Sequence, residues 1–188
     1  MKRCVLINFL ITLFVIALIV IEGIVWLCIL PDTVVTHWDA AGNPNGWGSK
    51  WGFVLICSLV PLGLMLFMSL IGICLPKVPD DLINLPNKEY YLAPQNRSST
   101  FNYIRISFLQ FSNALAIYML VVEFSCGMAN YYSWWPQAAF IWAPMGIFLA
   151  WMVFWVICLY RRFRRPTAHL LPGSGTRPDD TDNLLKDY

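Results

Sequence analysis

Four ionisable side chains stand where they could act on a ligand: Glu22, Glu123, His37 and Asp39. Glu22 and Glu123 interrupt long apolar runs, where a charge is costly unless it is paired, hydrated or protonated. His37 and Asp39 are two residues apart, so on an extended segment their side chains point the same way. They could bind a proton or a cation, or they could simply brace a loop. One His and one Asp are too few for a metal site, and no cofactor motif or nucleophile–base pair occurs, so we expect neither a cofactor nor an enzyme.

The elements that position these groups belong to a strongly apolar chain. Of its 188 residues, 58% are hydrophobic and 13% are charged, whereas soluble domains carry about 25% charged residues. This composition excludes an ordinary soluble enzyme and a nucleic-acid binder with a basic surface. A helix needs about 20 apolar residues to cross a bilayer. The sequence therefore predicts an all-α integral membrane protein, a single domain over residues 1–165 with four transmembrane helices at about 4–30, 52–75, 106–129 and 138–160.

Lys and Arg are distributed very unevenly around these runs. Twelve of the thirteen lie before the first run, between the second and third, or after the fourth, and Lys50 alone lies on the other side. The positive-inside rule predicts that both termini are cytoplasmic. Residues 166–188 have the composition of a disordered cytoplasmic tail. Aromatic residues near the run ends predict the two bilayer interfaces, with Trp26, Trp38, Trp47, Trp51, Trp134 and Trp135 outside and Tyr103 and Tyr160 inside.

The segment 31–51 forms the predicted outer loop. Thr33 to Trp38 is β-branched and aromatic, which favours an extended strand. Asp39 can cap a turn, and Asn43 to Gly46 is a dense turn signal. We expect an ordered loop with a short β-ribbon, in which Trp38 and Trp47 stack across the turn. The residues that would shape this loop are Pro31, Gly42, Asn45, Gly46, Trp47 and Gly48.

Glu22 and Glu123 fall at similar predicted depths, ~13 Å and ~10 Å below the outer ends of their helices at ~1.5 Å per residue. Each belongs to a stripe of small and polar residues, the kind that packed membrane helices place at interfaces. The stripes are Asn8, Thr12, Ile19 and Glu22 on the first helix and Ser112, Ala116, Glu123 and Gly127 on the third. We predict that these stripes face each other or a shared cavity. A functional cavity in which the carboxyl groups share a proton and a purely structural contact both stay open.

The predicted cytoplasmic loop, residues 76–105, contains four prolines and cannot be one helix. The third membrane helix is expected to begin near Gln95. The aromatic residues Tyr90, Tyr91, Phe101 and Tyr103 either anchor this segment to headgroups or dock a cytoplasmic regulator. Cys28 and Cys126 lie near outer helix ends, where a disulfide and a role as small apolar fillers are both open.

Two segments carry a family resemblance. The first is Leu30-Pro31-Asp32, Thr36-His37, Asp39, Gly42 and Asn45-Gly46-Trp47-Gly48; the second, residues 83–94, contains Asn84, Pro86, Asn87, Lys88, Tyr91 and Pro94. Over about residues 10–128 the chain resembles small bacterial multi-pass membrane proteins catalogued as a domain of unknown function. A related module occurs in SdpI-like proteins, which give immunity to a secreted toxin that attacks the cell membrane. The resemblance implies the same membrane setting here.

We therefore expect a non-catalytic membrane protein of immunity, sensing or regulatory type at the bacterial cell envelope. Its partners would be the lipid bilayer and an envelope peptide or toxin, and not nucleic acid; a cytoplasmic regulator and a homo-oligomer stay open. The alternative is a small transporter or proton-coupled carrier using Glu22 and Glu123. A membrane-embedded enzyme is the third reading, and it rests only on His37, Asp39 and the two glutamates.

Overall fold

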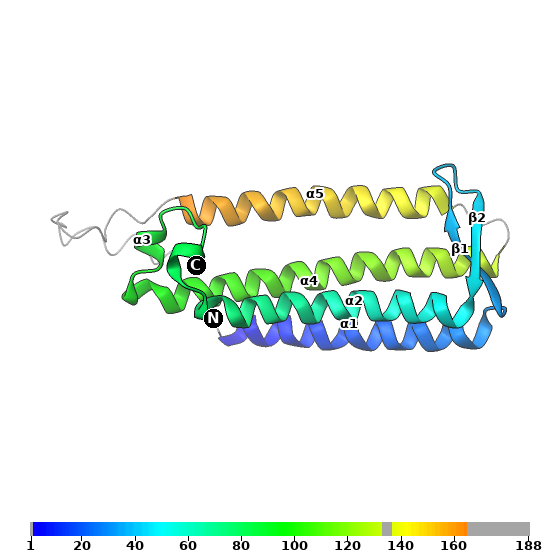
Figure 1. Cartoon of the computed structure of the whole chain (residues 1–188), viewed down its shortest axis with the longest axis horizontal. Coiled ribbons are helices and arrows are strands. Elements are labelled where there is room, and N and C mark those ends of the chain that lie inside the picture. The colour runs from blue at the N-terminus through cyan, green and yellow to red at the C-terminus, as the bar shows by residue number, and fades with distance from the viewer. Residues whose placement is uncertain (1, 133–136, 165–188) are drawn as a thin grey trace.

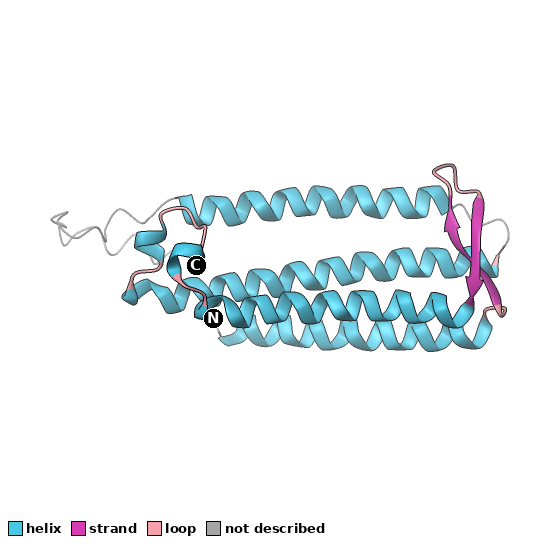
Figure 2. Cartoon of the chain, in the orientation of Figure 1, coloured by secondary structure: helices cyan, strands magenta, loops and turns pink. Residues whose placement is uncertain are grey.

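The computed structural model describes residues 2–132 and 137–164. Within them, four helices are long and apolar enough to cross a membrane. They lie side by side, with a two-stranded sheet across one end and short helices at the other (Figure 1, Figure 2). The long helices are α1 (Lys2–Ile29), α2 (Lys50–Cys74), α4 (Pro94–Tyr131) and α5 (Gln137–Arg164). The smaller elements are β1 (Thr33–Trp38), β2 (Pro44–Ser49), η1 (Leu75–Lys77), η2 (Asp80–Leu82) and α3 (Lys88–Tyr91).

The start of α1 and the end of α5 lie at the same end of the bundle, and the β1–β2 hairpin lies at the other (Figure 1). The predictions of four long apolar helices and a short β-ribbon between the first two are thus confirmed at the level of the fold. Trp134, Trp135 and the predicted tail over residues 166–188 lie outside the described residues.

The helix boundaries follow from local chemistry. Ser49 caps α2, because its Oγ accepts a hydrogen bond from the Gly52 amide at 3.1 Å. Pro94 occupies the first turn of α4, where its missing N–H costs nothing. With 38 residues, α4 is ~57 Å long, so it extends well beyond a hydrocarbon layer of ~30 Å.

The central element is α4, which contacts α1, α2 and α5. Midway along the bundle, α1, α2 and α4 bury a shared apolar cluster made by Val15, Ile19, Met65, Ala116 and Leu120. Nearer the hairpin, Trp26 is only 3% exposed because it is packed between α1 and α4. The assignment of Trp26 to the bilayer interface is therefore wrong, since its ring fills a helix–helix contact. Trp47 and Trp51, at 62% and 59% exposed, keep the exposure that such anchors need.

Aromatic rings join α5 to α4. Phe111 of α4 lies 5.0 Å from Trp155 and 6.2 Å from Phe148, measured between ring centroids. Tyr118 stacks on Phe148 at 5.0 Å. The exposed side chains of α5 are largely apolar, including Ile147, Val153 and Phe154, which suits contact with lipid.

Candidate functional site

The hairpin closes through a tight turn at residues 39–43. The Asp39 amide donates to the Asn43 carbonyl at 2.9 Å, and the Gly42 amide donates to the Asp39 carbonyl at 3.0 Å. Gly42 adopts φ 91°, a conformation that glycine allows without strain. The sequence placed a turn at Asn43–Gly46 instead, and that placement is wrong. Asn45 and Gly46 lie within β2, because the turn that the Asp39 carboxylate stabilises is complete before Pro44.

The side chain of Asp39 organises this turn. Its Oδ1 accepts hydrogen bonds from the amides of Ala41 and Asn43 at 2.9 and 2.8 Å, and its Oδ2 accepts one from the Asn43 side chain. The side-chain bond from Asn43, followed by the backbone bonds, lowers the pKa of Asp39 below its usual value. The His37 ring nitrogen Nδ1 is hydrogen-bonded to Asn45 Oδ1 across the ribbon. Both side chains therefore make the bracing contacts that a structural role requires.

The strand register corrects a second expectation. Val35 pairs with Trp47 and Trp38 pairs with Pro44. The two tryptophans thus occupy different rungs, and they do not face each other across the turn as predicted. Register shifts on either side of His37 account for the offset, because a bulge changes which residues oppose one another.

Asn130 of α4 holds the hairpin over the helix bundle. The Val35 amide donates to Asn130 Oδ1 at 2.6 Å, and Asn130 Nδ2 donates to the Val35 carbonyl at 3.0 Å. This carboxamide imitates a neighbouring strand on the outer edge of β1. At the base of the hairpin, the Lys50 amide donates to the Asp32 carbonyl at 3.0 Å. Sequence reasoning missed Asn130, although an Asn at the outer end of a membrane helix was the available signal.

A cavity of about 510 Å³ lies between the hairpin and the neighbouring ends of α4 and α5. His37 and Asp39 both line it, so the structure brings this predicted pair to one cavity. Its wall on the α5 side is apolar. The full lining is Thr36, His37, Trp38, Asp39, Ala40, Gly42, Cys126, Ile141 and Trp142.

Glu123 is buried on the bundle side of this outer cavity. Its side chain is 3% exposed, and neither carboxyl oxygen has a hydrogen-bond partner among the described residues. It lines a second cavity of about 280 Å³ between α2 and α4, together with Cys57, Tyr118, Met119, Val122 and Cys126. Because Cys126 lines both cavities, the buried carboxyl group lies about one helical turn from the outer one.

Glu22 has a different environment. It is half-buried, accepts a hydrogen bond from Trp26 Nε1 at 3.1 Å, and lines a groove between α1 and α4. Glu22 lies one helical turn before Trp26, and Glu123 lies one helical turn before Gly127. Because Trp26 packs against Gly127, the two glutamates lie at a similar level along the bundle. Glu22 lines this groove whereas Glu123 lines the cavity of about 280 Å³ between α2 and α4, and a cavity shared by both stays a prediction. The stripes themselves do face each other: Thr12 Oγ1 donates to Asn113 Oδ1 at 3.0 Å.

Five cysteines are free in the structure, namely Cys28, Cys57, Cys74, Cys126 and Cys158. Cys28 is exposed while Cys126 is half-buried against the outer cavities. Across residues 2–132 and 137–164, no cluster of three or more His, Cys, Asp or Glu side chains is arranged to hold a metal ion.

The predicted cytoplasmic motif caps the end of α5. Asn87 Nδ2 donates to the carbonyls of Phe163 and Arg164 at 2.9 and 3.1 Å, and the Tyr91 hydroxyl donates to the Arg162 carbonyl at 2.8 Å. These bonds satisfy carbonyls that a helix end leaves without intrahelical partners. Asn87 reaches them from a left-handed conformation with φ 53°.

Burial corrects the expected role of two aromatics at this end. Tyr91 and Phe101 are buried in a cluster with Phe163 and Ile104, so they do not anchor the segment to lipid headgroups. Burial raises the pKa of the Tyr91 hydroxyl, and the nearby Arg162 opposes that shift. Of the other motif residues, Lys88 begins α3, Pro94 begins α4, and Asn84 and Pro86 are exposed.

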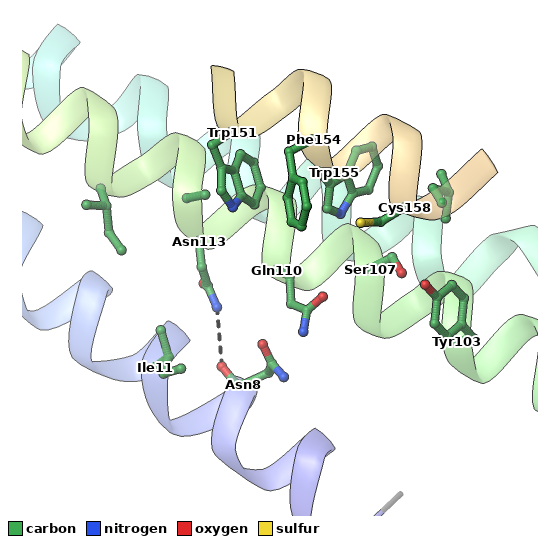
Figure 3. A pocket seen from close by; sticks show the side chains of 13 residues that line it. Asn8, Ile11, Tyr103, Ser107, Gln110, Asn113, Trp151, Phe154, Trp155 and Cys158 are labelled. Atoms are coloured by element: carbon green, nitrogen blue, oxygen red, sulfur yellow. Dashed lines mark hydrogen bonds between the residues drawn. The ribbon is translucent and has the colours of Figure 1, made fainter. Parts of the chain in front are cut away.

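A third cavity, of about 500 Å³, lies between α1, α4 and α5 in the half of the bundle away from the hairpin (Figure 3). Asn113 points from α4 toward α1, where its Nδ2 donates to the Asn8 carbonyl at 3.4 Å, and Gln110 lies beside this contact. Trp151, Phe154 and Trp155 come from α5. The spacing of Ser107, Gln110 and Asn113 on one helical face was the signal that sequence reasoning left unused.

Comparison with known proteins gives one match, which covers the first part of the chain. Searches of curated proteins and of solved structures found no match. Residues 12–60, which run from α1 through the hairpin into α2, match a domain of unknown function, DUF1648.

Proposed function

We propose that this protein is a non-catalytic membrane protein of immunity, sensing or regulatory type that binds a peptide at the outer face of the bacterial cytoplasmic membrane. The observation that carries the proposal is the braced hairpin above a cavity of about 510 Å³. The two hydrogen bonds between Asn130 and Val35, together with the Asp39 turn, hold the hairpin in place. A preorganised surface binds a partner at a lower entropic cost than a slack loop does.

The lining of the outer cavity favours a cationic amphipathic peptide. Trp38, Ile141 and Trp142 offer apolar and aromatic surface, and Asp39 supplies a carboxylate kept ionised by the turn. Peptides that act on membranes combine basic residues with an apolar face. Trp47, exposed at the same end, would hold this site near the lipid surface, where such peptides accumulate. The resemblance to SdpI-like immunity proteins agrees with this class of partner.

The orientation of the protein is part of the proposal. Twelve basic residues belong to the end of the bundle where α1 begins or to segments that follow α5, whereas Lys50 is at the hairpin end. By the positive-inside rule, this asymmetry supports an orientation with the hairpin outside and both termini in the cytoplasm. A cysteine introduced at Asn45 should react with a membrane-impermeant maleimide in whole cells, whereas one introduced at Asn84 should react only after lysis.

Deletion of the gene followed by challenge with cationic membrane-active peptides tests the function in cells. Sensitivity should rise in the deletion strain and return to normal with the wild-type gene. Trp142→Ala should fail to complement, because it removes a wall of the outer cavity. Trp51→Ala is the matched control, since Trp51 is exposed and does not line that cavity. Unchanged sensitivity in the deletion strain would contradict the proposal.

A second function, proton-coupled transport, is favoured by one observation. Both carboxyl oxygens of Glu123 are buried without a hydrogen-bond partner, and ionisable groups inside membrane spans often mark proton pathways. Glu22 lies at a similar level on the neighbouring helix α1. Purified protein in liposomes containing a pH-sensitive dye tests this function. Proton uptake that Glu123→Gln abolishes would favour it, and the same uptake in that variant would exclude Glu123 as the proton site.

A further inference from the structure

The groove between α1, α4 and α5 lies in the half of the bundle away from the hairpin, and any role for it is independent of the function proposed above. We propose that it binds the head group of a membrane-soluble quinone. The inference rests on four features of the groove: its polar floor, its aromatic wall, the absence of charge from its lining, and its place in the hydrocarbon layer.

The polar floor is formed by Asn113 and Gln110, and of these two carboxamides only that of Gln110 is left to bind a ligand. The Asn113 carboxamide is engaged on both sides, by Thr12 and by the Asn8 carbonyl. Gln110 is exposed in the groove and has no hydrogen-bond partner among the described residues. A free carboxamide in a hydrocarbon environment is unfavourable, so a ligand that both accepts and donates hydrogen bonds would be stabilised there. The carbonyl oxygens of a quinone accept such bonds, and the hydroxyls of its reduced form donate them.

The opposite wall is aromatic. Trp151 and Trp155 occupy successive turns of α5, with ring centroids 6.5 Å apart and ring planes 26° from parallel. Phe154 lies between them along the helix and also lines the groove (Figure 3). Flat rings pack well in offset stacks against other aromatic rings. A planar head group therefore fits this wall better than a flexible acyl chain does.

The charge of the lining separates a quinone from a phospholipid headgroup. Of the thirteen side chains that line the groove, none is charged at neutral pH. A phosphate placed there would be desolvated without a counter-charge, which is strongly unfavourable. The Arg162 guanidinium lies 5.5 Å from the centroid of the Tyr103 ring, and Arg162 is not one of the lining residues. The ligand head group is consequently neutral.

The depth of the groove agrees with a ligand that arrives through the lipid. Gln110 follows Tyr103 by seven residues, so it lies ~10 Å deeper along α4. The groove opens between α1 and α5, and the outward surfaces of both helices are apolar. Its volume of about 500 Å³ falls in the range of ~300–1,000 Å³ that small-molecule sites occupy. A prenyl or alkyl tail can leave the groove directly into the bilayer.

Titration of the full-length protein in lipid nanodiscs with decylubiquinone tests the inference, with tryptophan fluorescence as the readout. We expect saturable quenching above the linear background of empty nanodiscs. Gln110→Leu should weaken binding at least tenfold, whereas Gln95→Leu, the same change at an exposed site of α4 outside the groove, should leave the dissociation constant within twofold. Trp155→Phe should remove a fixed part of the saturable quenching, which would locate the ligand.

A competitor separates head-group recognition from simple filling by an alkyl chain. Excess decanol, which has the chain without the ring, should not displace the quinone. The inference would be overturned by any of three results: no saturable quenching in the wild-type protein, equal quinone affinity in Gln110→Leu, or displacement of the quinone by decanol. Thermal unfolding of Gln110→Leu checks that its fold is retained, and Trp155→Leu provides an independent groove variant if it is not. None of these outcomes depends on peptide binding at the hairpin.

Discussion

The indole ring of Trp26 lies directly against the backbone of Gly127. A Cβ atom at Gly127 would stand 2.3 Å from Cε2 of the tryptophan, closer than any real contact. The same ring donates a hydrogen bond from Nε1 to Glu22. This contact therefore fixes the separation of α1 and α4 and the level of the two membrane glutamates, just below the hairpin.

Gly127→Ala should destabilise the protein by about 1–3 kcal/mol, because the added methyl group overpacks a rigid ring. The midpoint of thermal unfolding in detergent measures this change. Gly63→Ala is the matched control, since nothing lies within 4 Å of a Cβ at that glycine of α2. Alanine there should be neutral or stabilising by about 0.5–1 kcal/mol. Equal effects at the two positions would argue against the close Trp26 contact.

Glu123→Leu should stabilise the protein. The substitution removes two buried oxygens that have no hydrogen-bond partner, and a buried unsatisfied polar group costs about 1–3 kcal/mol. Glu22→Leu should gain less, because it also breaks the hydrogen bond from Trp26. Unfolding midpoints of the two variants, compared under the same conditions, measure the difference. A loss of stability in Glu123→Leu would mean that the carboxyl group has a structural role.

Asn87→Ala should loosen the end of α5. The change removes two hydrogen bonds to the Phe163 and Arg164 carbonyls and places alanine at a positive φ, with an expected cost of about 1–3 kcal/mol. Asn87→Gly keeps the backbone conformation and should cost less. Hydrogen exchange of the last turn of α5 reports the effect, and Asn84→Ala, at an exposed neighbour, should leave that exchange unchanged.

The hairpin turn should lose order in acid. Hydrogen bonds from Asn43 and Ala41 lower the pKa of Asp39 from its ordinary value of 3.8. A group with a lowered folded-state pKa contributes stability at pH values above its unfolded pKa. That contribution falls as the pH drops through the still lower folded-state pKa. Amide exchange of Ala41 and Asn43 should thus stay slow at neutral pH and accelerate only below about pH 4. Asp39→Asn should show no such pH step.

Much of the fold could be predicted from local sequence. Length and hydropathy predict the long helices, because lipid requires internally satisfied backbone over about 20 residues. The β-branched run ending at Trp38 predicts β1. Small and polar residues at helical spacing indicated the faces on which α1 and α4 meet, as the Thr12–Asn113 hydrogen bond shows.

The errors arise where distant parts of the chain decide the outcome. From the sequence, Trp26 resembles an anchor at the bilayer interface. In the structure its ring packs against Gly127, which lies about a hundred residues later in the chain. The Asn43–Gly46 turn signal was overruled by the side chain of Asp39. The partners of Asn87 lie some 76 residues further along the chain, so no local pattern could identify its capping role.

Peptide binding at the hairpin is the central claim, and one binding experiment tests it most directly. A fluorescent synthetic amphipathic peptide of Lys and Leu is titrated against the protein in nanodiscs of neutral lipid, with empty nanodiscs as the background. We predict saturable binding of the peptide to the wild-type protein. Trp142→Ala should raise the dissociation constant at least tenfold, whereas Trp51→Ala should change it by less than twofold. Binding no greater than that to empty nanodiscs, or equal binding by both variants, would contradict it.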